Sequence, residues 1–151
     1  MEESRYERFI LAVDGIHKAV QKLKMGMATK FGLKGVHVMW LCELLHSEDG
    51  LTGGELSEIS QVNRSLVSRE LEQLSENGYV SIVMIRPSGY KARIMLTEKG
   101  RAAATEIEAA AIEFQKRAGF GVSGEDMKTF YETLERICEN LSSIASKDNE
   151  G

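Results

Sequence analysis

The sequence predicts a mainly α-helical fold with one small β-hairpin. The 151-residue chain contains a single proline and is rich in alanine, glutamate, lysine and leucine, which favour helices. Apolar residues recur at spacings of three and four over long stretches near both ends, a pattern typical of amphipathic helices. One pair of β-rich segments separated by a turn lies between these stretches. These observations place a hairpin within an otherwise helical chain.

The composition indicates one globular domain over residues 1–151, because a chain of this length buries a sizeable core. Apolar residues make up 42% of the chain and charged residues 28%, as in soluble proteins. No apolar run approaches the ~20 residues that span a bilayer, and the charged N-terminus resembles no secretory signal, so no membrane association is expected. Two cysteines, Cys42 and Cys138, make no disulfide framework, which favours the reducing cytoplasm.

The first two helices are predicted at about Tyr6–Phe31 and Val36–Ser47. Glycines around residues 26–35 mark the break between them. The second helix is apolar nearly all round and is therefore expected to be buried. One face of the first helix carries a long apolar stripe: Phe9, Val13, Ile16, Val20, Leu23 and Met27.

A short helix is predicted to begin after Thr52. Thr52 and Glu55 have the spacing of a capping box, in which each side chain satisfies a free backbone N–H group of the other residue. Leu56 and Ile59 are expected to face the core. The helix should end at the turn formed by residues 60–62.

The next helix is predicted to begin at Asn63, a favourable N-cap, and to stop at Asn77-Gly78. Its buried face is marked by three apolar residues: Val67, Leu71 and Leu74. Two short helices joined by a tight turn form a helix-turn-helix.

Two strands are predicted after it, Tyr79–Ile85 and Ala92–Leu96, with a turn at Pro87–Gly89. A helix-turn-helix followed by a hairpin is a winged helix-turn-helix, here at about residues 36–100. Glu70 and Glu72 are expected to face away from any bound phosphates.

Two helices follow the hairpin, the first alanine-rich and ending near Ala118, the second at about Glu125–Ala145. Ser123 and Asp126 resemble a capping box at the start of the second. Residues 5–32 and 101–146 thus flank the winged helix with apolar faces that its core does not need. We expect these faces to form a homodimer, whereas in the alternative the end helices pack on each other within one chain.

The charge distribution is uneven although the net charge is −4. The segment Asn63–Arg101 holds seven basic and four acidic residues, so its charge is +3 and that of the remaining chain is −7. A basic region on an acidic body can bind a polyanion locally, although an excess of this size is also within ordinary scatter.

The segment Asn63–Arg101 is predicted to contact double-stranded DNA, because the second helix of a helix-turn-helix presents its N-terminal residues to the major groove. Asn63 is expected chiefly to cap the helix, and Leu66 either to touch a thymine methyl group or, preferably, to cover the neighbouring helix. Arg69 has Glu72 or Glu76 as alternative partners. The hairpin residues have the alternative of a solvated, charged edge. The expected DNA contacts are Asn63, Arg64, Ser65, Leu66, Ser68 and Arg69 in the helix and Arg86, Tyr90, Lys91 and Arg93 in the hairpin.

The motifs Val67-Ser68-Arg69, Asn77-Gly78-Tyr79-Val80 and Leu96–Gly100 resemble those of the multiple antibiotic resistance regulator (MarR) family, and the helix order fits over nearly the whole chain. The resemblance implies a dimeric winged-helix transcription regulator, usually a repressor that leaves a palindromic operator when a small-molecule effector or an oxidant acts. The resemblance also places His37, Met39 and Trp40 near the family's ligand pocket, so they are candidates for binding the effector; the alternative is that they are ordinary core residues. The family's Asp-Arg pair in the wing is absent here, so Lys91 or Arg93 would replace its arginine.

Other chemistry finds little support in the sequence. The three histidines, at positions 17, 37 and 46, lack the spacing of a metal site, so neither a metal nor another cofactor is expected. Both cysteines lie on apolar helix faces and are interpreted as core thiols rather than redox switches. No nucleophile elbow, phosphate loop or zinc-protease motif occurs, which argues against an enzyme. The alternative function is a winged-helix dimer that binds a protein partner.

Overall fold

A computed structural model of the chain describes residues 4–84 and 92–148. The chain divides into two compact units, residues 1–111 and 112–151, and each is described by itself. The boundary lies inside one helix. The prediction of a single domain over residues 1–151, with a winged helix at about 36–100, stays a prediction.

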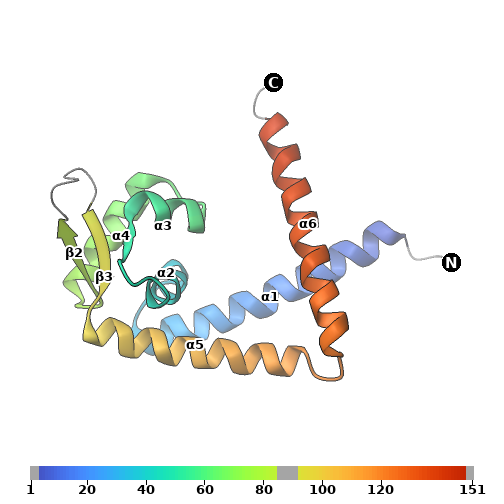
Figure 1. The fold of residues 1–151 in the computed structure, drawn as a ribbon, viewed down its shortest axis with the longest axis horizontal. Helices are drawn as coiled ribbons and strands as arrows, with labels where there is room; N and C mark the ends of the chain where they lie inside the picture. The colour runs from blue at the N-terminus through green and yellow to red at the C-terminus, as the bar shows by residue number, and fades with distance from the viewer. Residues whose placement is uncertain (1–3, 85–91, 149–151) are drawn as a thin grey trace. The chain divides into compact units, whose positions relative to one another are not determined.

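The first unit begins with two helices, α1 (Arg5–Phe31) and α2 (Gly35–Leu45) (Figure 1). Helix α1 stops at Gly32, whose φ of 66° lies in the left-handed region that glycine adopts without steric cost. Helix α2 contacts α1, α3 and the sheet. Both helices begin and end within two residues of the predicted positions.

The helix-turn-helix consists of α3 (Gly53–Ser60) and α4 (Arg64–Glu76). The Thr52 hydroxyl accepts a hydrogen bond from the Glu55 N–H at 3.1 Å, and the Glu55 carboxylate accepts one from the Thr52 N–H at 2.8 Å. This confirms the predicted capping box. The Asn63 side chain accepts from the Leu66 N–H at 2.9 Å, which confirms its role as the N-cap of α4.

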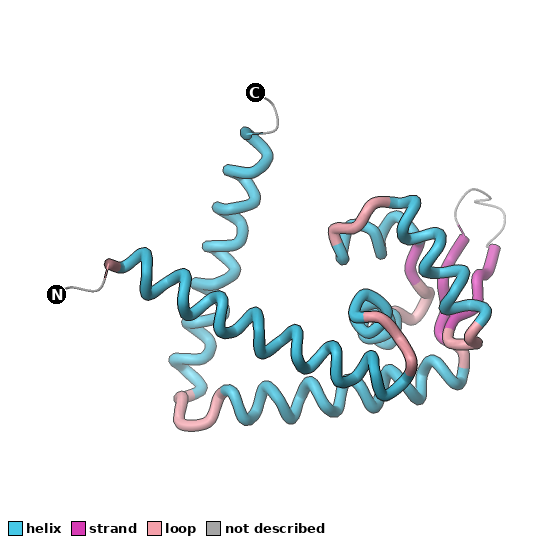
Figure 2. The backbone as a smooth tube through the Cα atoms, turned by 180° about the vertical axis from the view of Figure 1, so that it is seen from behind, coloured by secondary structure: helices cyan, strands magenta, loops and turns pink. Residues whose placement is uncertain are grey.

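The described strands form one antiparallel sheet in the order β1-β3-β2 (Figure 2). Strands β2 (Val80–Met84) and β3 (Ala92–Leu96) form the predicted hairpin, with Ile82 opposite Ile94. The third strand, β1 (Leu51–Thr52), was not predicted. It pairs with β3 through only two residues, too few to show an alternating pattern in the sequence.

Helix α5 (Glu98–Ala118) follows the sheet and continues into the second unit, where α6 (Gly124–Asp148) completes the chain. The Ser123 hydroxyl accepts from the Asp126 N–H at 3.1 Å, as predicted for a cap. The same hydroxyl also lies 2.8 Å from the Asp126 carboxylate, to which it donates in turn.

The core lies in the first unit, among α1, α2, α3, α4, the sheet and the start of α5. Trp40, Leu41, Leu56 and Leu74 are fully buried. Val67, Leu71 and Leu74 all belong to this core, which confirms the predicted inward face of α4. The other buried apolar residues of the core are Ala28, Val38, Leu44, Tyr79, Val80, Ile94, Ala103, Ala104 and Ile107.

Two predicted core residues lie elsewhere. Ile59, expected to face inward, is 40% exposed, because the eight-residue helix α3 buries only Leu56. Cys138 is exposed in the single chain, since no residue described in α6 is buried there. Cys42 is half-buried against the core, and burial raises the pKa of its thiol, which keeps the reactive thiolate scarce.

Apolar side chains remain uncovered on the two end helices. In the first half of α1, Phe9, Val13 and Ile16 are 40%, 42% and 55% exposed. Along α6, Phe130, Leu141 and Ile144 are 43%, 53% and 56% exposed. In the described ranges, no helix combines the length and the apolar character needed to cross a membrane. In the same ranges, no group of three histidine, cysteine or acidic side chains is placed to hold a metal ion.

Candidate nucleic-acid interface

The turn between α3 and α4 fixes the direction in which α4 leaves the core. Gln61 ends α3 with a φ of 56°, a left-handed conformation uncommon outside glycine and asparagine. The Ser57 hydroxyl donates to the Val62 carbonyl at 2.5 Å, which closes the turn. Asn63 then caps α4, so three consecutive local interactions set where this helix begins.

The N-terminal residues of α4 form a polar surface. Arg64, Ser65, Ser68 and Arg69 are exposed, whereas Leu66 is half-buried and lies beside them. The Ser65 hydroxyl donates to the Asn63 side chain at 2.8 Å. In the described part of the chain, Arg69 forms no ion pair with Glu72 or Glu76, so the predicted alternative partners do not hold it. We call residues 63–69 the α4 surface.

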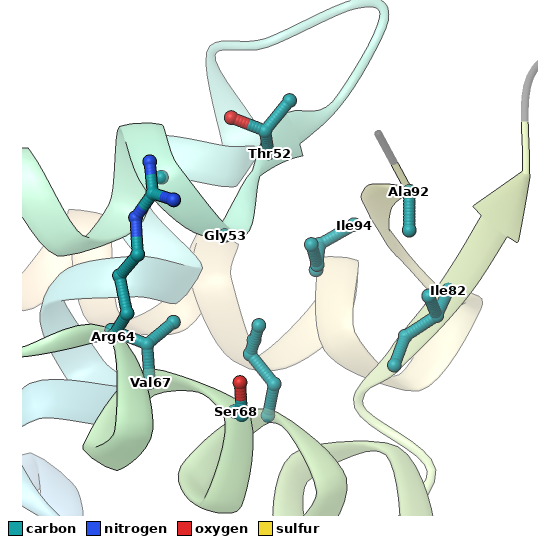
Figure 3. Close-up of a pocket in the computed structure, with 10 residues that line it drawn as sticks. Thr52, Gly53, Arg64, Val67, Ser68, Ile82, Ala92 and Ile94 are labelled. Atoms are coloured by element: carbon teal, nitrogen blue, oxygen red, sulfur yellow. The ribbon is translucent and has the colours of Figure 1, made fainter. Parts of the chain in front are cut away.

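A cavity of about 370 Å³ lies between α3, α4 and the sheet (Figure 3). Arg64 and Ser68 line it from α4, and Ile82, Ala92 and Ile94 face them from the hairpin. The guanidinium group of Arg64 lies against the start of α3, where a Cβ on Gly54 would be 3.2 Å from Nη2. The exposed cation of Arg64 is therefore supported by the neighbouring helix.

The hairpin residues are only partly described. Arg86, Tyr90 and Lys91 lie outside the described residues. Arg93 is the second residue of β3 and lies opposite Thr52, and its guanidinium group donates to the Gly50 carbonyl at 3.2 Å. It is also 3.7 Å from the Glu55 carboxylate. The structure thus gives Arg93 an intramolecular role, and its predicted DNA contact stays a prediction.

The residues expected near an effector lie in α2. His37 and Trp40 are buried, and Met39 is half-buried. The rings of His37 and Trp40 are tilted by 42° to each other, and their centroids are 6.2 Å apart. The lining of the cavity between α3, α4 and the sheet does not include these residues, nor does that of a second cavity beside Lys34 and Glu70. Their part in ligand binding stays a prediction.

A partly buried ionic cluster that the sequence analysis missed connects α2 with α4. Glu70, predicted only to face away from DNA, is 4% exposed and accepts hydrogen bonds from the Lys34 ammonium at 2.8 and 3.0 Å. Its second oxygen lies 2.7 Å from Nε2 of His37. A signal was present in the sequence, because residue 70 falls on the buried face with Val67, Leu71 and Leu74. A carboxylate on such a face requires a partner.

The cluster makes stability depend on pH in a defined direction. Burial lowers the pKa of His37, against the opposing hydrogen bond to Glu70. The hydrogen bond from Lys34 is the largest effect on the pKa of Glu70 and lowers it. A group whose pKa is lower in the folded chain contributes stability above its unfolded pKa and loses it as the pH falls.

We therefore expect the free energy of unfolding to decrease on acidification below about pH 6.5, the ordinary pKa of histidine. Urea unfolding at pH 7.5 and pH 5.5 measures this decrease, and it should be smaller in His37→Gln. His17→Gln, which changes an exposed histidine of α1, serves as the control and should keep the wild-type decrease. An equal decrease in wild type and His37→Gln would contradict the assignment.

Comparisons with known proteins agree with this geometry. The model of the family described as sugar-specific transcriptional regulator TrmB matches residues 27–95, which include α2, the helix-turn-helix and most of the sheet. No curated protein matches the chain significantly in sequence.

Solved structures resemble nearly the whole chain. One is described as a putative MarR family transcriptional regulator from Listeria monocytogenes complexed with 26mer DNA; it has a TM-score of 0.81 and 17% identity, and the match covers 94% of each chain. A MarR transcriptional regulator from Methanosarcina mazei has a TM-score of 0.73 and 22% identity, with coverage of 91% of this chain and 92% of the other. A MarR family regulator from Silicibacter pomeroyi has a TM-score of 0.72 and 24% identity, with coverage of 86% and 87%. The resemblance inferred from the motifs is therefore confirmed in the fold: this chain has the winged helix-turn-helix architecture of the MarR family regulators.

Proposed function

We propose that the protein is a DNA-binding transcription regulator whose α4 surface enters the major groove. The observation that carries this proposal is the exposed N-terminus of α4, where Arg64, Ser65, Ser68 and Arg69 lie together beside the hairpin. Arginine can contact guanine through two hydrogen bonds, and serine can donate to a base or a phosphate. One solved structure with this fold is described as complexed with DNA.

We propose further that two copies act together as a homodimer on a palindromic operator. The uncovered apolar stripes of α1 and α6 support this, because apolar faces of this length are usually buried against another helix. A twofold dimer presents two copies of α4, which matches two half-sites about one helical turn apart. Repression, release by a small-molecule effector and a cytoplasmic location complete the proposal and follow from the family resemblance.

The first experiment is fluorescence anisotropy of the purified protein on DNA from upstream of its own gene, beside a scrambled duplex, at several salt concentrations. Specific binding should exceed binding to the scrambled duplex, and log K should fall with log salt by about 0.9 per phosphate contact. Equal, weak binding to both duplexes at low salt would instead favour the alternative function, a winged-helix dimer that binds a protein partner. Recovery of such a partner in a pull-down would support that alternative.

Within the same assay, Arg64→Ala is expected to weaken specific binding by about 1–3 kcal/mol, because it removes a direct contact to a base or phosphate. Lys22→Ala serves as the matched control, since it removes a positive charge from the exposed side of α1. That variant should bind like the wild type. Unchanged affinity in Arg64→Ala, with the wild type binding specifically, would remove Arg64 from the interface.

A further inference from the structure

Helix α4 carries a buried carboxylate next to its exposed surface. Glu70 follows Arg69 directly, yet Arg69 is exposed and Glu70 is 4% exposed. The side chain lies beside a polar surface lined by Lys34, Arg69, Glu72, Gln73 and Glu76 but is itself covered, so an unpaired charge would be costly. The charge of Glu70 is compensated, because both of its carboxylate oxygens are hydrogen-bonded to residues at the start of α2.

The hydrogen bonds fix which nitrogen of His37 carries the proton. The Lys34 backbone N–H donates to Nδ1 of His37 at 3.2 Å, so Nδ1 is an acceptor and the neutral ring is protonated on Nε2. Nε2 then donates to Glu70 at 2.7 Å. Lys34, His37 and Glu70 thus form one directed network, in which the Lys34 ammonium and Nε2 of His37 donate to the Glu70 carboxylate.

This network joins α2 directly to α4, two helices that also contribute apolar side chains to the same core. The hydrophobic effect is non-directional, whereas hydrogen bonds weaken steeply away from their preferred distances and angles. Residues 64–69 lie on the same two turns of α4 as Glu70, so a rotation of the helix at residue 70 also turns their side chains.

We propose that Lys34, His37 and Glu70 are positioning residues for DNA recognition, which set the rotation of α4 and thereby the direction of Arg64 and Ser68. The inference rests on the proposed DNA binding and adds to it three residues that touch no DNA. It assigns a purpose to an acidic residue in the helix that reads the operator.

The direction in which DNA affinity changes when Glu70 is replaced distinguishes a positioning role from charge repulsion. Removing a negative charge from a DNA-binding helix should strengthen binding, because that charge repels phosphates. Removing Glu70 should instead weaken specific binding, because α4 loses its fixed rotation. Glu72, exposed on the same helix, provides the matched comparison.

The test compares full-length wild type, Glu70→Gln and Glu72→Gln by anisotropy on operator DNA and on a scrambled duplex. We expect Glu70→Gln to lower the ratio of specific to nonspecific affinity by about 2- to 30-fold, as for other residues that couple to a site without contacting it. Glu72→Gln should keep that ratio and bind both duplexes as well as the wild type or better. A merely structural role would change the melting temperature and leave the ratio unchanged at temperatures well below melting.

A second pair keeps the test decisive should Glu70→Gln fold poorly. Lys34→Met should lower the ratio of specific to nonspecific affinity. Lys34→Arg keeps the cation and should have a ratio close to that of the wild type. An unchanged or raised ratio in both Glu70→Gln and Lys34→Met, beside a wild type that binds its operator, overturns the positioning role alone. A wild type that binds no DNA overturns the proposed function and this inference with it.

Discussion

Gly100→Ala should destabilise the fold by about 3 kcal/mol, the upper end of the usual cost of overpacking a core. Gly100 is buried near the start of α5, and a Cβ at this position would lie 1.9 Å from the carbonyl oxygen of Tyr79. That neighbour is backbone, held in place because the same oxygen accepts a hydrogen bond from the Thr97 N–H at 3.1 Å. The clash therefore cannot be relieved by a change of side-chain rotamer.

Urea unfolding followed by circular dichroism measures this loss. Gly26→Ala is the matched control, because Gly26 lies inside α1 with nothing within 4 Å of an added Cβ. That variant should gain about 0.5–1 kcal/mol, the ordinary advantage of alanine over glycine in a helix. Equal stabilities for the two variants would show that α5 and the Tyr79 backbone are not in close contact.

Leu141→Asp should separate the proposed dimer and lower operator affinity by about 100-fold or more. Two linked DNA-binding units bind more tightly than one by at least this factor. Leu141 is 53% exposed in the single chain and lies on the apolar stripe of α6 with Phe130, Ile137 and Ile144. A carboxylate there would have to be buried in the dimer without a partner. Sedimentation velocity and anisotropy on the operator measure the two effects.

Ser143→Asp provides the control, because it adds the same charge to α6 about 200° around the helix from residue 141. It should remain dimeric and bind DNA like the wild type. A Leu141→Asp variant that keeps the wild-type sedimentation coefficient would place the dimer interface elsewhere, and a monomeric wild type would refute the dimer itself.

The elements that could be predicted from sequence were those specified by local interactions. The apolar periodicity located the long helices, and the side chains of Thr52 and Asn63 located the starts of α3 and α4, because each cap satisfies N–H groups within three residues. The hairpin was recognisable from its two β-rich segments. Strand β1 was missed, since its pairing with β3 joins residues more than 40 positions apart.

The candidate site was predictable only on its exposed side. The position of Arg64 and Ser68 at the start of α4 followed from the N-cap, and the structure leaves both exposed. The roles of Arg93 and Glu70 depended on partners in other elements, the Gly50 carbonyl and the side chains of Lys34 and His37. A single sequence records the charge of such residues but not which way they point.

The position of Trp40 gives the protein an internal optical label. It is the chain's single tryptophan, it is fully buried, and within the described residues its indole N–H has no hydrogen-bond partner. Its ring lies 6.2 Å from that of His37, so its emission originates beside the network that orients α4. Fluorescence excited selectively at tryptophan, and not at the four tyrosines, therefore reports on the surroundings of Trp40. An effector or operator that changes those surroundings would change the emission without an attached dye.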